Sequence, residues 1–339
     1  MNSSLRYCVP LLTLLLAACG GDKRLPEYQL TGSTMGTTYS VKLIAPGEDI
    51  DKVELQSRIT ETLAAVDKLT STWRDDSALS RFNADRSTDW IDVSAEFCSA
   101  IESALAVSSA SNGAFDITVG PLVNLWGFGP DGEHQEPPDA GALGAAMADV
   151  GYEGIVPGCD RPAVRKRSGT MYIDLSGWAK GYGVDQIAAV LDEFALNDYL
   201  VEIGGELRMR GQNAEGRKWA IAIEVPSTTT RQPQSVLRLT DTSVATSGDY
   251  RNYFEHDGEH YSHTIDARTG RPVTHDLAAV TVISDTAAYA DAMATALLVL
   301  GPDNGLTLAE DLGIAGYFLV RNQTGIKELT TSSFDLLRN

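Results

Sequence analysis

The order of two hydrophobic periodicities along the chain is what most constrains its fold. Early in the chain, apolar residues recur at three- and four-residue steps, as expected of a helix facing a core: Leu55, Ile59, Leu63, Val66 and Leu69. From residue 199 onward, alternating apolar and polar residues predict strands over 199–203, 207–210, 219–225, 236–239 and 280–283. Helices early and hairpins late predict an α+β fold, with mixed, largely antiparallel sheets and packed helices, rather than a doubly wound parallel sheet.

Five further elements complete this prediction. Residues 39–43 alternate as a strand, and a helix is expected over 94–113 with Ser94 as its N-cap. Residues 171–175 alternate as another strand that runs into a helix at Ser176. A last helix is expected over 284–300 and is closed by Gly301 and Pro302.

Charge limits the partners of this chain. It carries 27 basic and 46 acidic residues among 339, a net charge of -19, so attraction to nucleic acid is not expected to be its main role. Apolar residues make up 43% of the sequence, which is enough for a folded core.

The first eighteen residues are expected to be a signal peptide. Arg6 precedes an apolar run over residues 9–18, which is far shorter than the roughly 20 residues that span a bilayer. Residues 16–20 (LAACG) resemble the lipobox of bacterial lipoproteins, in which Cys19 is lipidated and begins the mature chain. The alternative is an ordinary secretory cleavage site with an incidental cysteine. Both export the protein, and we predict an anchor and tether over 19–27 and one domain over 28–339.

The remaining cysteines allow one disulfide. Cys8 leaves with the signal peptide and Cys19 carries the lipid, so Cys98 and Cys159 remain. Two thiols can pair, but they form neither a disulfide scaffold nor a zinc site.

Two motifs are set aside because of their context. Gly127, Gly129 and Gly132 fit G-x-G-x-x-G, but a polar segment follows where a dinucleotide site needs a helix. His256, His260 and His263 suggest a metal cluster, but residues 257–258 (DG) predict a hairpin turn that places His260 on the opposite face from the other two.

One pair of oxygen-bearing side chains could hold a hard cation. Asp291 and Thr295 are four residues apart on the last predicted helix, so they share one face. A carboxylate and a hydroxyl are oxygen ligands of the kind that Mg²⁺ prefers. The alternative is that Asp291 is solvated and Thr295 bonds to its own helix backbone.

The strand-to-helix junction at residues 174–180 could receive phosphate. A helix N-terminus presents unpaired amides and partial positive charge, and Lys180 adds a full charge in the first turn. The alternative is that Lys180 is a solvated first-turn side chain.

Taken together, these segments resemble the ApbE family of bacterial FAD:protein FMN transferases over about residues 28–320. The strings that carry the resemblance are GSTMGTTYSV from Gly32, STWRDDSALSRFN from Ser71, GAFDITVGPLVNLWGFG from Gly113, YIDLSGWAKGYGVD from Tyr172, VEIGGELRMRG from Val201, TSGDYRNYF from Thr246, HTIDARTGRPV from His263 and ADAMATALLVLG from Ala290. The resemblance implies a T-fold-related single catalytic unit. In this family a magnesium-bound FAD is split at its diphosphate, FMN is joined to a threonine hydroxyl of a partner protein, and AMP leaves.

The resemblance also implies the site residues. Those implied for the flavin are Met35, Trp73, Ala114, Phe115, Asp116, Asp174, Lys180 and Ile265. The metal would be bound by the side chains of Asp291 and Thr295 and by the backbone carbonyl of Gly177. Trp73 stands where many relatives have tyrosine, so it keeps an aromatic ring but lacks the hydroxyl. From the residues alone, Met35, Phe115 and Ile265 fit core packing at least as well.

The nucleophile needs a base, and His263 is our candidate. On the predicted hairpin it shares a face with Phe254 and Tyr261 and points inward; the alternative is a buried structural histidine. Asp291 is the other predicted catalytic residue, through the metal.

Two other functions stay open. These are a magnesium-dependent FAD pyrophosphatase that gives FMN and AMP, and a noncatalytic flavin-binding lipoprotein. The expected acceptors are exported subunits of membrane redox complexes, and the expected location is the periplasmic side of the inner membrane.

Overall fold

The computed structural model describes residues 24–45, 50–130, 135–226, 233–249 and 252–338. The predicted signal peptide and the Cys19 lipidation site lie outside the described residues. No helix in the described part of the chain is long and apolar enough to cross a membrane.

An eight-stranded sheet organises the molecule, and every strand pair that the described residues form is antiparallel. This confirms the predicted fold class. In spatial order the strands are β1 (Glu27–Thr34), β2 (Thr37–Ile44), β6 (Tyr199–Ile203), β7 (Glu206–Arg210), β10 (Thr242–Gly248), β15 (Leu277–Ser284), β16 (Ala315–Asn322) and β17 (Gly325–Thr330).

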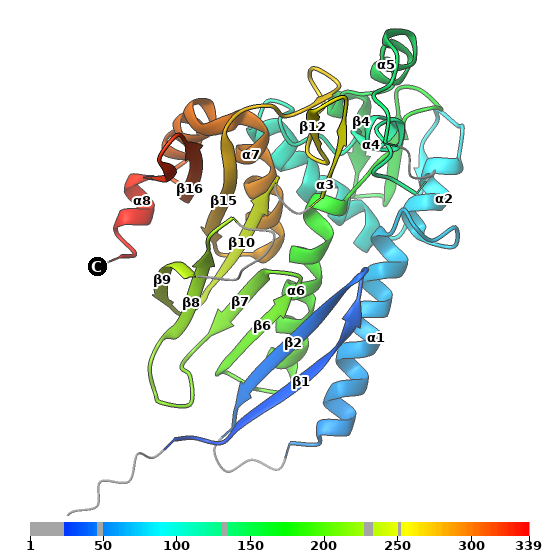
Figure 1. The fold of residues 1–339 in the computed structure, drawn as a ribbon. Coiled ribbons are helices and arrows are strands. Elements are labelled where there is room, and N and C mark those ends of the chain that lie inside the picture. Colours follow the sequence, from blue (N-terminus) through cyan, green and yellow to red (C-terminus); the bar gives the residue numbers. More distant parts are fainter. Residues whose placement is uncertain (1–23, 46–49, 131–134, 227–232, 250–251, 339) are drawn as a thin grey trace, which may run out of the picture.

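Helices cover one face of this sheet, and a two-stranded ribbon packs on the other (Figure 1). The helices are α1 (Lys52–Thr70), α2 (Ala78–Ala84), α3 (Ala95–Ala110), α4 (Gly120–Leu125), α5 (Ala140–Met147), α6 (Ser176–Glu193), α7 (Ala287–Asp311) and α8 (Ser332–Asp335), with a 3-10 turn at Tyr152–Gly154. The ribbon is β8 (Trp219–Glu224) with β9 (Pro233–Leu239). Three smaller groups are β3 (Ile91–Asp92), β5 (Ala163–Lys166) and β4 (Ile155–Gly158); β11 (Tyr253–His256) with β12 (Glu259–Ser262); and β13 (Ile265–Asp266) with β14 (Arg271–Pro272).

Most predicted elements form with bounds close to those expected. Leu55, Ile59, Leu63 and Val66 are the buried stripe of α1, and Ser94 caps α3 by accepting a hydrogen bond from the amide of Phe97. Asp257 and Gly258 both have positive φ and turn the β11–β12 hairpin, as the sequence predicts.

The predicted strand over 171–175 is wrong. Met171, Ile173 and Leu175 are buried in alternation, but the segment joins no sheet. Instead the Asn83 side chain donates to the carbonyl of Ile173 and accepts from its amide, both at 2.8 Å. A side-chain amide therefore replaces a neighbouring strand, which a hydrophobic pattern cannot show.

The predicted end of the last helix is also corrected. Thr286 caps α7, and Gly301 breaks its geometry with a φ of 78°, as expected. However, a further helical segment follows Pro302 and reaches Asp311, because proline is tolerated in the first turn of a helix.

Candidate active site

The start of α6 is built by the extended segment before it. Asp174 Oδ1 accepts hydrogen bonds from the amide of Ser176 at 2.7 Å and from its hydroxyl at 2.5 Å, so Asp174 fixes the first residue of the helix. The chain then enters α6 with Gly177 and Lys180 in the first turns. The predicted junction is therefore real, although an extended segment rather than a strand leads into it.

Lys180 lies between two buried carboxylates. Its Nζ is 3.6 Å from Asp291 Oδ1 and 3.5 Å from Glu206 Oε1, and both carboxylates are almost fully buried. Burial alone would lower the pKa of Lys180, but the negative charges of Asp291 and Glu206 outweigh this and raise it. Lys180 is therefore a permanent cation and not a solvated surface side chain.

Glu206 is the counterpart of Lys180 on the sheet side. Burial raises the pKa of its carboxyl to about 7, with the nearby charge of Asp291 adding to this and Lys180 opposing it. Its second oxygen, Oε2, is buried without a hydrogen-bond partner in the described residues. Lys180 is thus the one cation paired with both carboxylates, Asp291 and Glu206, among the described residues. The carboxylate oxygens can therefore accept a further positive charge.

Asp291 is also fixed by the backbone of α6. Its Oδ2 accepts a hydrogen bond from the amide of Gly181 at 3.1 Å. This contact requires α6 and α7 to lie very close together, and Gly181 allows it because a Cβ there would be 2.2 Å from the carbonyl oxygen of Ala287. Asp291 thereby connects the two helices at the site.

Thr295 and Gly177 meet one turn further along α7. A Cβ on Gly177 would lie 3.2 Å from Thr295 Oγ1 and 3.3 Å from the ring of Phe115, so three of the predicted site residues meet here. Thr295 Oγ1 donates to the carbonyl of Asp291 at 3.2 Å and lies 3.1 Å from the hydroxyl of Ser247. The backbone bond that we gave as the alternative for Thr295 is present, and Ser247 is a second partner.

The oxygen set fits a magnesium ion that shares its coordination with a substrate. Among the described residues no group of three or more His, Cys, Asp and Glu side chains could hold a metal. Mg²⁺ is typically bound by one or two carboxylates together with substrate phosphates. Asp291, Thr295 and the cradle at Gly177 offer such a partial set, and a Cβ at Gly177 would fill it.

Met35 forms the tip of the β1–β2 hairpin and lies against α6. Both Met35 and Gly36 have positive φ, as a tight two-residue turn requires. A Cβ on Gly183 would lie 2.8 Å from Met35 Cε. A Cβ on Gly204 would lie 3.1 Å from the methyl group of Thr37 and 3.4 Å from Cδ of Lys180. The hairpin tip therefore adjoins Lys180.

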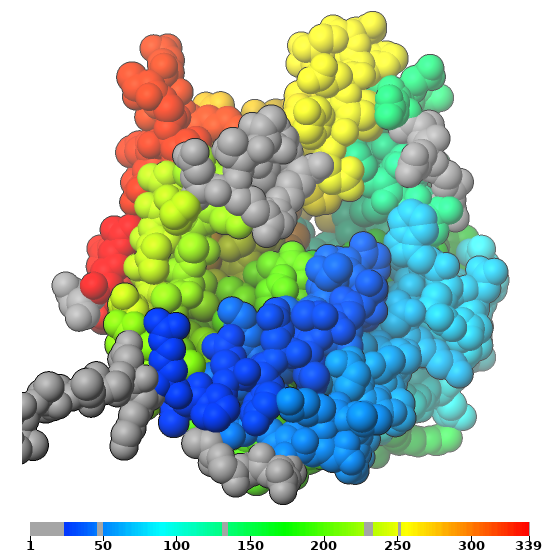
Figure 2. All heavy atoms as spheres, turned by 60° about the horizontal axis from the view of Figure 1, so that its bottom comes forward, coloured from blue at the N-terminus to red at the C-terminus, as the bar shows by residue number. Residues whose placement is uncertain are grey.

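The remaining predicted flavin residues differ in how accessible they are. Trp73 is 66% exposed, while Ala114, Phe115 and Ile265 are buried. Ile265 packs in a cluster with Trp126 and Phe254, which matches the core-packing alternative. In Figure 2 the β1–β2 hairpin and the segment that follows α1 lie side by side, and the β11–β12 hairpin projects opposite them.

Asp116 connects its own loop to the 3-10 turn at Tyr152. Its Oδ1 accepts from the amide and the hydroxyl of Thr118, and its Oδ2 accepts from the amide of Tyr152 at 3.0 Å. Burial raises the pKa of this carboxyl, and those hydrogen bonds oppose the increase. The structure thus gives Asp116 a loop-ordering role, and the sequence reasoning gave no sign of these bonds.

His263 follows the β11–β12 hairpin, and its ring makes one hydrogen bond to the described residues, through Nδ1. Its Nδ1 is 3.0 Å from the carbonyl oxygen of Asn252, which can only accept, so Nδ1 carries the hydrogen and Nε2 keeps a lone pair. Burial lowers the pKa of His263 and the charge of Lys180 lowers it further, while Asn252 and Asp249 oppose this. The ring is neutral near pH 7, as a base must be; its edge contact with Phe128 fits the structural alternative equally well.

Two residues of the site were not predicted from the sequence. Glu206 follows a turn at Gly204 and Gly205, and Ser247 lies on β10. Both are within strings that carried the family resemblance, VEIGGELRMRG and TSGDYRNYF. An acidic residue directly after a Gly-Gly turn, at the first position of β7, was the available signal for Glu206.

Together, the fold and this arrangement define an α+β protein whose candidate site brings a buried lysine–carboxylate pair and a threonine hydroxyl together where α6 meets α7. The ApbE family matches residues 35–318 of the chain. FAD:protein FMN transferases are 42% identical in Vibrio cholerae, over 97% of both chains, and 40% identical in Haemophilus influenzae, over 96% of this chain and 95% of the other.

Solved structures agree. The flavin transferase ApbE of Vibrio cholerae has a TM-score of 0.85 at 40% identity, covering 92% of this chain and 99% of the other. The apo flavinyl transferase ApbE of Pseudomonas stutzeri has a TM-score of 0.85 at 39% identity, covering 93% and 98%. The chain belongs to the ApbE family.

Proposed function

We propose that this chain is an enzyme that transfers FMN from FAD to a protein, and that the acceptor group is a threonine hydroxyl. The observation that carries the proposal is the meeting of Lys180, Asp291, Thr295 and Gly177 where α6 begins, since Lys180 and a cation held by the oxygens there would supply the positive charge that a diphosphate needs in an otherwise acidic protein. Relatives with this printed activity match over nearly the whole chain.

The bond changes balance as follows. The threonine oxygen forms a phosphoester bond to the FMN phosphorus, the bond from that phosphorus to the bridging oxygen breaks, and AMP leaves with the bridging oxygen. The hydroxyl proton passes to Nε2 of His263, which the Asn252 carbonyl holds in the accepting tautomer. A bound Mg²⁺ would neutralise charge on the departing phosphate.

Each residue of this chain has a separate task. Lys180 supplies a fixed positive charge at the phosphates, and Asp291 holds both Lys180 and the amide of Gly181. Asp291, Thr295 and the Gly177 carbonyl would hold the metal. Ser247 orients the Thr295 hydroxyl. Met35 and Trp73 would contact the flavin, and Asp116 orders the loop that carries Phe115.

We further propose that the protein is an exported lipoprotein, anchored through Cys19 on the periplasmic side of the inner membrane, which acts on exported subunits of membrane redox complexes. The disulfide between Cys98 and Cys159 supports export, because disulfides persist in oxidising compartments. A Cys19→Ala variant should appear in the soluble fraction, whereas a Cys8→Ala variant should stay with the membrane; equal distribution of the two would contradict the anchor.

Intact mass tests the reaction. The protein is incubated with FAD, Mg²⁺ and an exported redox subunit, and the acceptor should gain the mass of one FMN while AMP is released. The same acceptor with its threonine replaced by valine should gain nothing. AMP release without any gain of acceptor mass would instead assign the site to FAD hydrolysis.

A further inference from the structure

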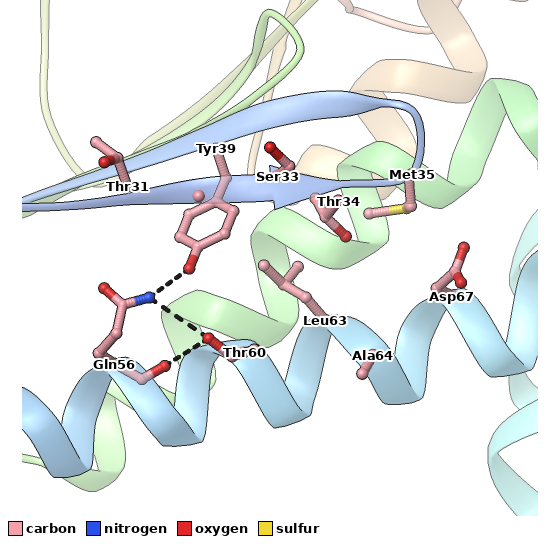
Figure 3. Close-up of a pocket in the computed structure, with 11 residues that line it drawn as sticks. Thr31, Ser33, Thr34, Met35, Tyr39, Gln56, Thr60, Leu63, Ala64 and Asp67 are labelled. Atoms are coloured by element: carbon pink, nitrogen blue, oxygen red, sulfur yellow. Dashed lines mark hydrogen bonds between the residues drawn. The ribbon is translucent and has the colours of Figure 1, made fainter.

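The β1–β2 hairpin and α1 form the two walls of a groove with a volume of about 390 Å³ (Figure 3). One wall is the last half of β1 and the other is a stripe of α1 at helical spacing. The lining residues are Thr31, Gly32, Ser33, Thr34, Met35 and Tyr39 of the hairpin and Gln56, Thr60, Leu63, Ala64 and Asp67 of α1. Most carry hydroxyl, amide or carboxylate groups, with an apolar floor at Leu63, Ala64 and Met35.

The β1 wall is the edge of the eight-stranded sheet. Thr34 and Thr37 form the closing pair of a two-residue turn and exchange both backbone hydrogen bonds. Because hydrogen-bonded and non-hydrogen-bonded pairs alternate along an antiparallel ladder, this closing pair determines which residues of β1 bond to β2. The backbone N–H and C=O groups of Thr31 and Ser33 consequently point away from β2, toward the open edge. In the described part of the chain, neither backbone bonds to another segment.

Room at this edge depends on Gly32. A Cβ at Gly32 would lie 2.5 Å from the ring of Tyr39, so only glycine lets that ring lie flat across the strand. The Tyr39 hydroxyl accepts a hydrogen bond from the Gln56 amide at 2.5 Å, which fixes the ring against α1. These contacts hold the groove open.

The groove leads directly to the candidate active site. Met35 lines its far end and also packs against α6 at Gly183. Thr37, the next residue but one, adjoins Lys180 across Gly204. An extended chain lying along β1 would therefore be carried to the phosphate-binding residues at the hairpin tip.

From these observations, and resting on the proposed function, we propose that this groove, lined by the eleven residues above, docks the acceptor protein. The occupant is an extended segment next to the acceptor threonine, which adds to β1 as a further strand. Main-chain hydrogen bonds to Thr31 and Ser33 give affinity with little demand on sequence, while alternate side chains face the floor at Leu63 and Ala64.

Two alanines on α1 provide a matched pair of variants. Ala64 and Ala65 are both exposed, but only Ala64 lines the groove. Ala64→Trp should fill the groove and raise the KM for an exported redox subunit by about tenfold or more. FAD affinity, measured by flavin fluorescence, should stay unchanged in both variants, and Ala65→Trp should have the wild-type KM.

A second measurement does not depend on turnover. Hydrogen exchange at the amides of Thr31 and Ser33 should slow when the wild-type protein binds the acceptor whose threonine is replaced by valine. An unchanged acceptor KM in Ala64→Trp, together with no protection of β1, would overturn the docking proposal. An equal loss of FAD affinity in Ala64→Trp would also overturn it, by assigning the groove to the nucleotide.

The two proposals fail differently. If wild-type protein attaches no FMN to the acceptor but β1 is protected by it, the transfer reaction is wrong and the docking surface stands. If transfer proceeds and neither Ala64→Trp nor hydrogen exchange responds, docking along β1 is wrong and the transfer reaction stands. A dimer that Ala64→Trp disrupts, seen by light scattering, would assign the groove to a second copy of this chain and overturn docking of the acceptor.

Discussion

Asp291 is the residue on which most contacts of the site converge. Replacing it with asparagine keeps an acceptor for the Gly181 amide but removes the charge that faces Lys180 and the proposed metal. We expect Asp291→Asn to reduce Mg²⁺-dependent AMP release from FAD by about 10² to 10³-fold with little change in melting temperature. Asp303→Asn, an exposed position on the same helix, is the control. Unchanged turnover in Asp291→Asn would reject the metal assignment.

His263 predicts a pH dependence whose sign follows from its surroundings. Because burial and Lys180 lower its pKa below the ordinary value of 6.5, the base is neutral at pH 7 and is lost only as the pH falls through the lowered pKa. The kcat/KM for transfer should therefore be flat above neutrality and should fall on acidification with an apparent pKa below 6.5. Stopped-flow or mass-based measurement of the transfer rate across about pH 5 to 8 tests this.

The structural alternative for His263 gives a different result. His263→Ala should slow transfer far more than it weakens FAD binding, and should remove the acidic limb of the profile. Equal losses in rate and FAD affinity, with the limb retained, would reassign His263 to packing against Phe128.

For single residues, the sequence predicted where a side chain lies on its helix better than it predicted which groups that side chain contacts. Spacing alone placed Asp291 and Thr295 on one helix face and Lys180 near a helix start, and the structure brings these elements together. It could not show that Lys180 is shared with Glu206, or that Asp116 accepts hydrogen bonds from its own loop and from the Tyr152 amide. Glu206 is about 26 residues from Lys180 along the chain, and Tyr152 is 36 residues from Asp116 and bonds through its backbone amide. A pattern of side chains along the sequence reveals neither contact.

The packing of α6 against α7 is the element-scale feature that positions the site. Gly181 lies where a Cβ would be 2.2 Å from the Ala287 carbonyl oxygen, and this is backbone that cannot move aside alone. We expect Gly181→Ala to lower the free energy of unfolding by about 1–3 kcal/mol by forcing the helices apart. It should also weaken the Gly181–Asp291 hydrogen bond and reduce FAD cleavage.

Gly144 in α5 is the matched control for Gly181. It is helical and exposed, and a Cβ there would meet nothing within 4 Å. Gly144→Ala should be neutral or should stabilise the protein by about 0.5–1 kcal/mol, because alanine costs less entropy in a helix. Urea unfolding of both variants tests this, and similar effects would show that helix contact is not what selects glycine at 181.

Elements were predictable where one periodicity controlled both burial and pairing. The stripe of α1 and the alternation of β6 meet both conditions, and their bounds are close to those expected. Residues 171–175 satisfy only burial, because Asn83 pairs with their backbone from another segment. Beyond Gly301, proline at the start of a new helical segment looked the same as a stop.

For the whole molecule, the disulfide between Cys98 and Cys159 is the covalent crosslink of the described chain, and it joins residues 61 positions apart. It joins α3 to the turn between β4 and β5, whereas the sequence showed only that one pair was available. Restricting the unfolded chain over that distance should stabilise the fold by about 4 kcal/mol. We expect Cys98→Ser with Cys159→Ser to lower the unfolding free energy by about this amount, measured in urea.

Reductant separates the crosslink from the substitutions themselves. Wild-type protein should shift toward the stability of the double variant when reduced, and the double variant should not respond to reductant at all. Because a cytosolic environment reduces such bonds, protein made there should resemble the double variant, and exported protein should not. If oxidised and reduced wild-type protein unfold at the same urea concentration, the crosslink adds nothing to stability, and the support that it lends to export is removed.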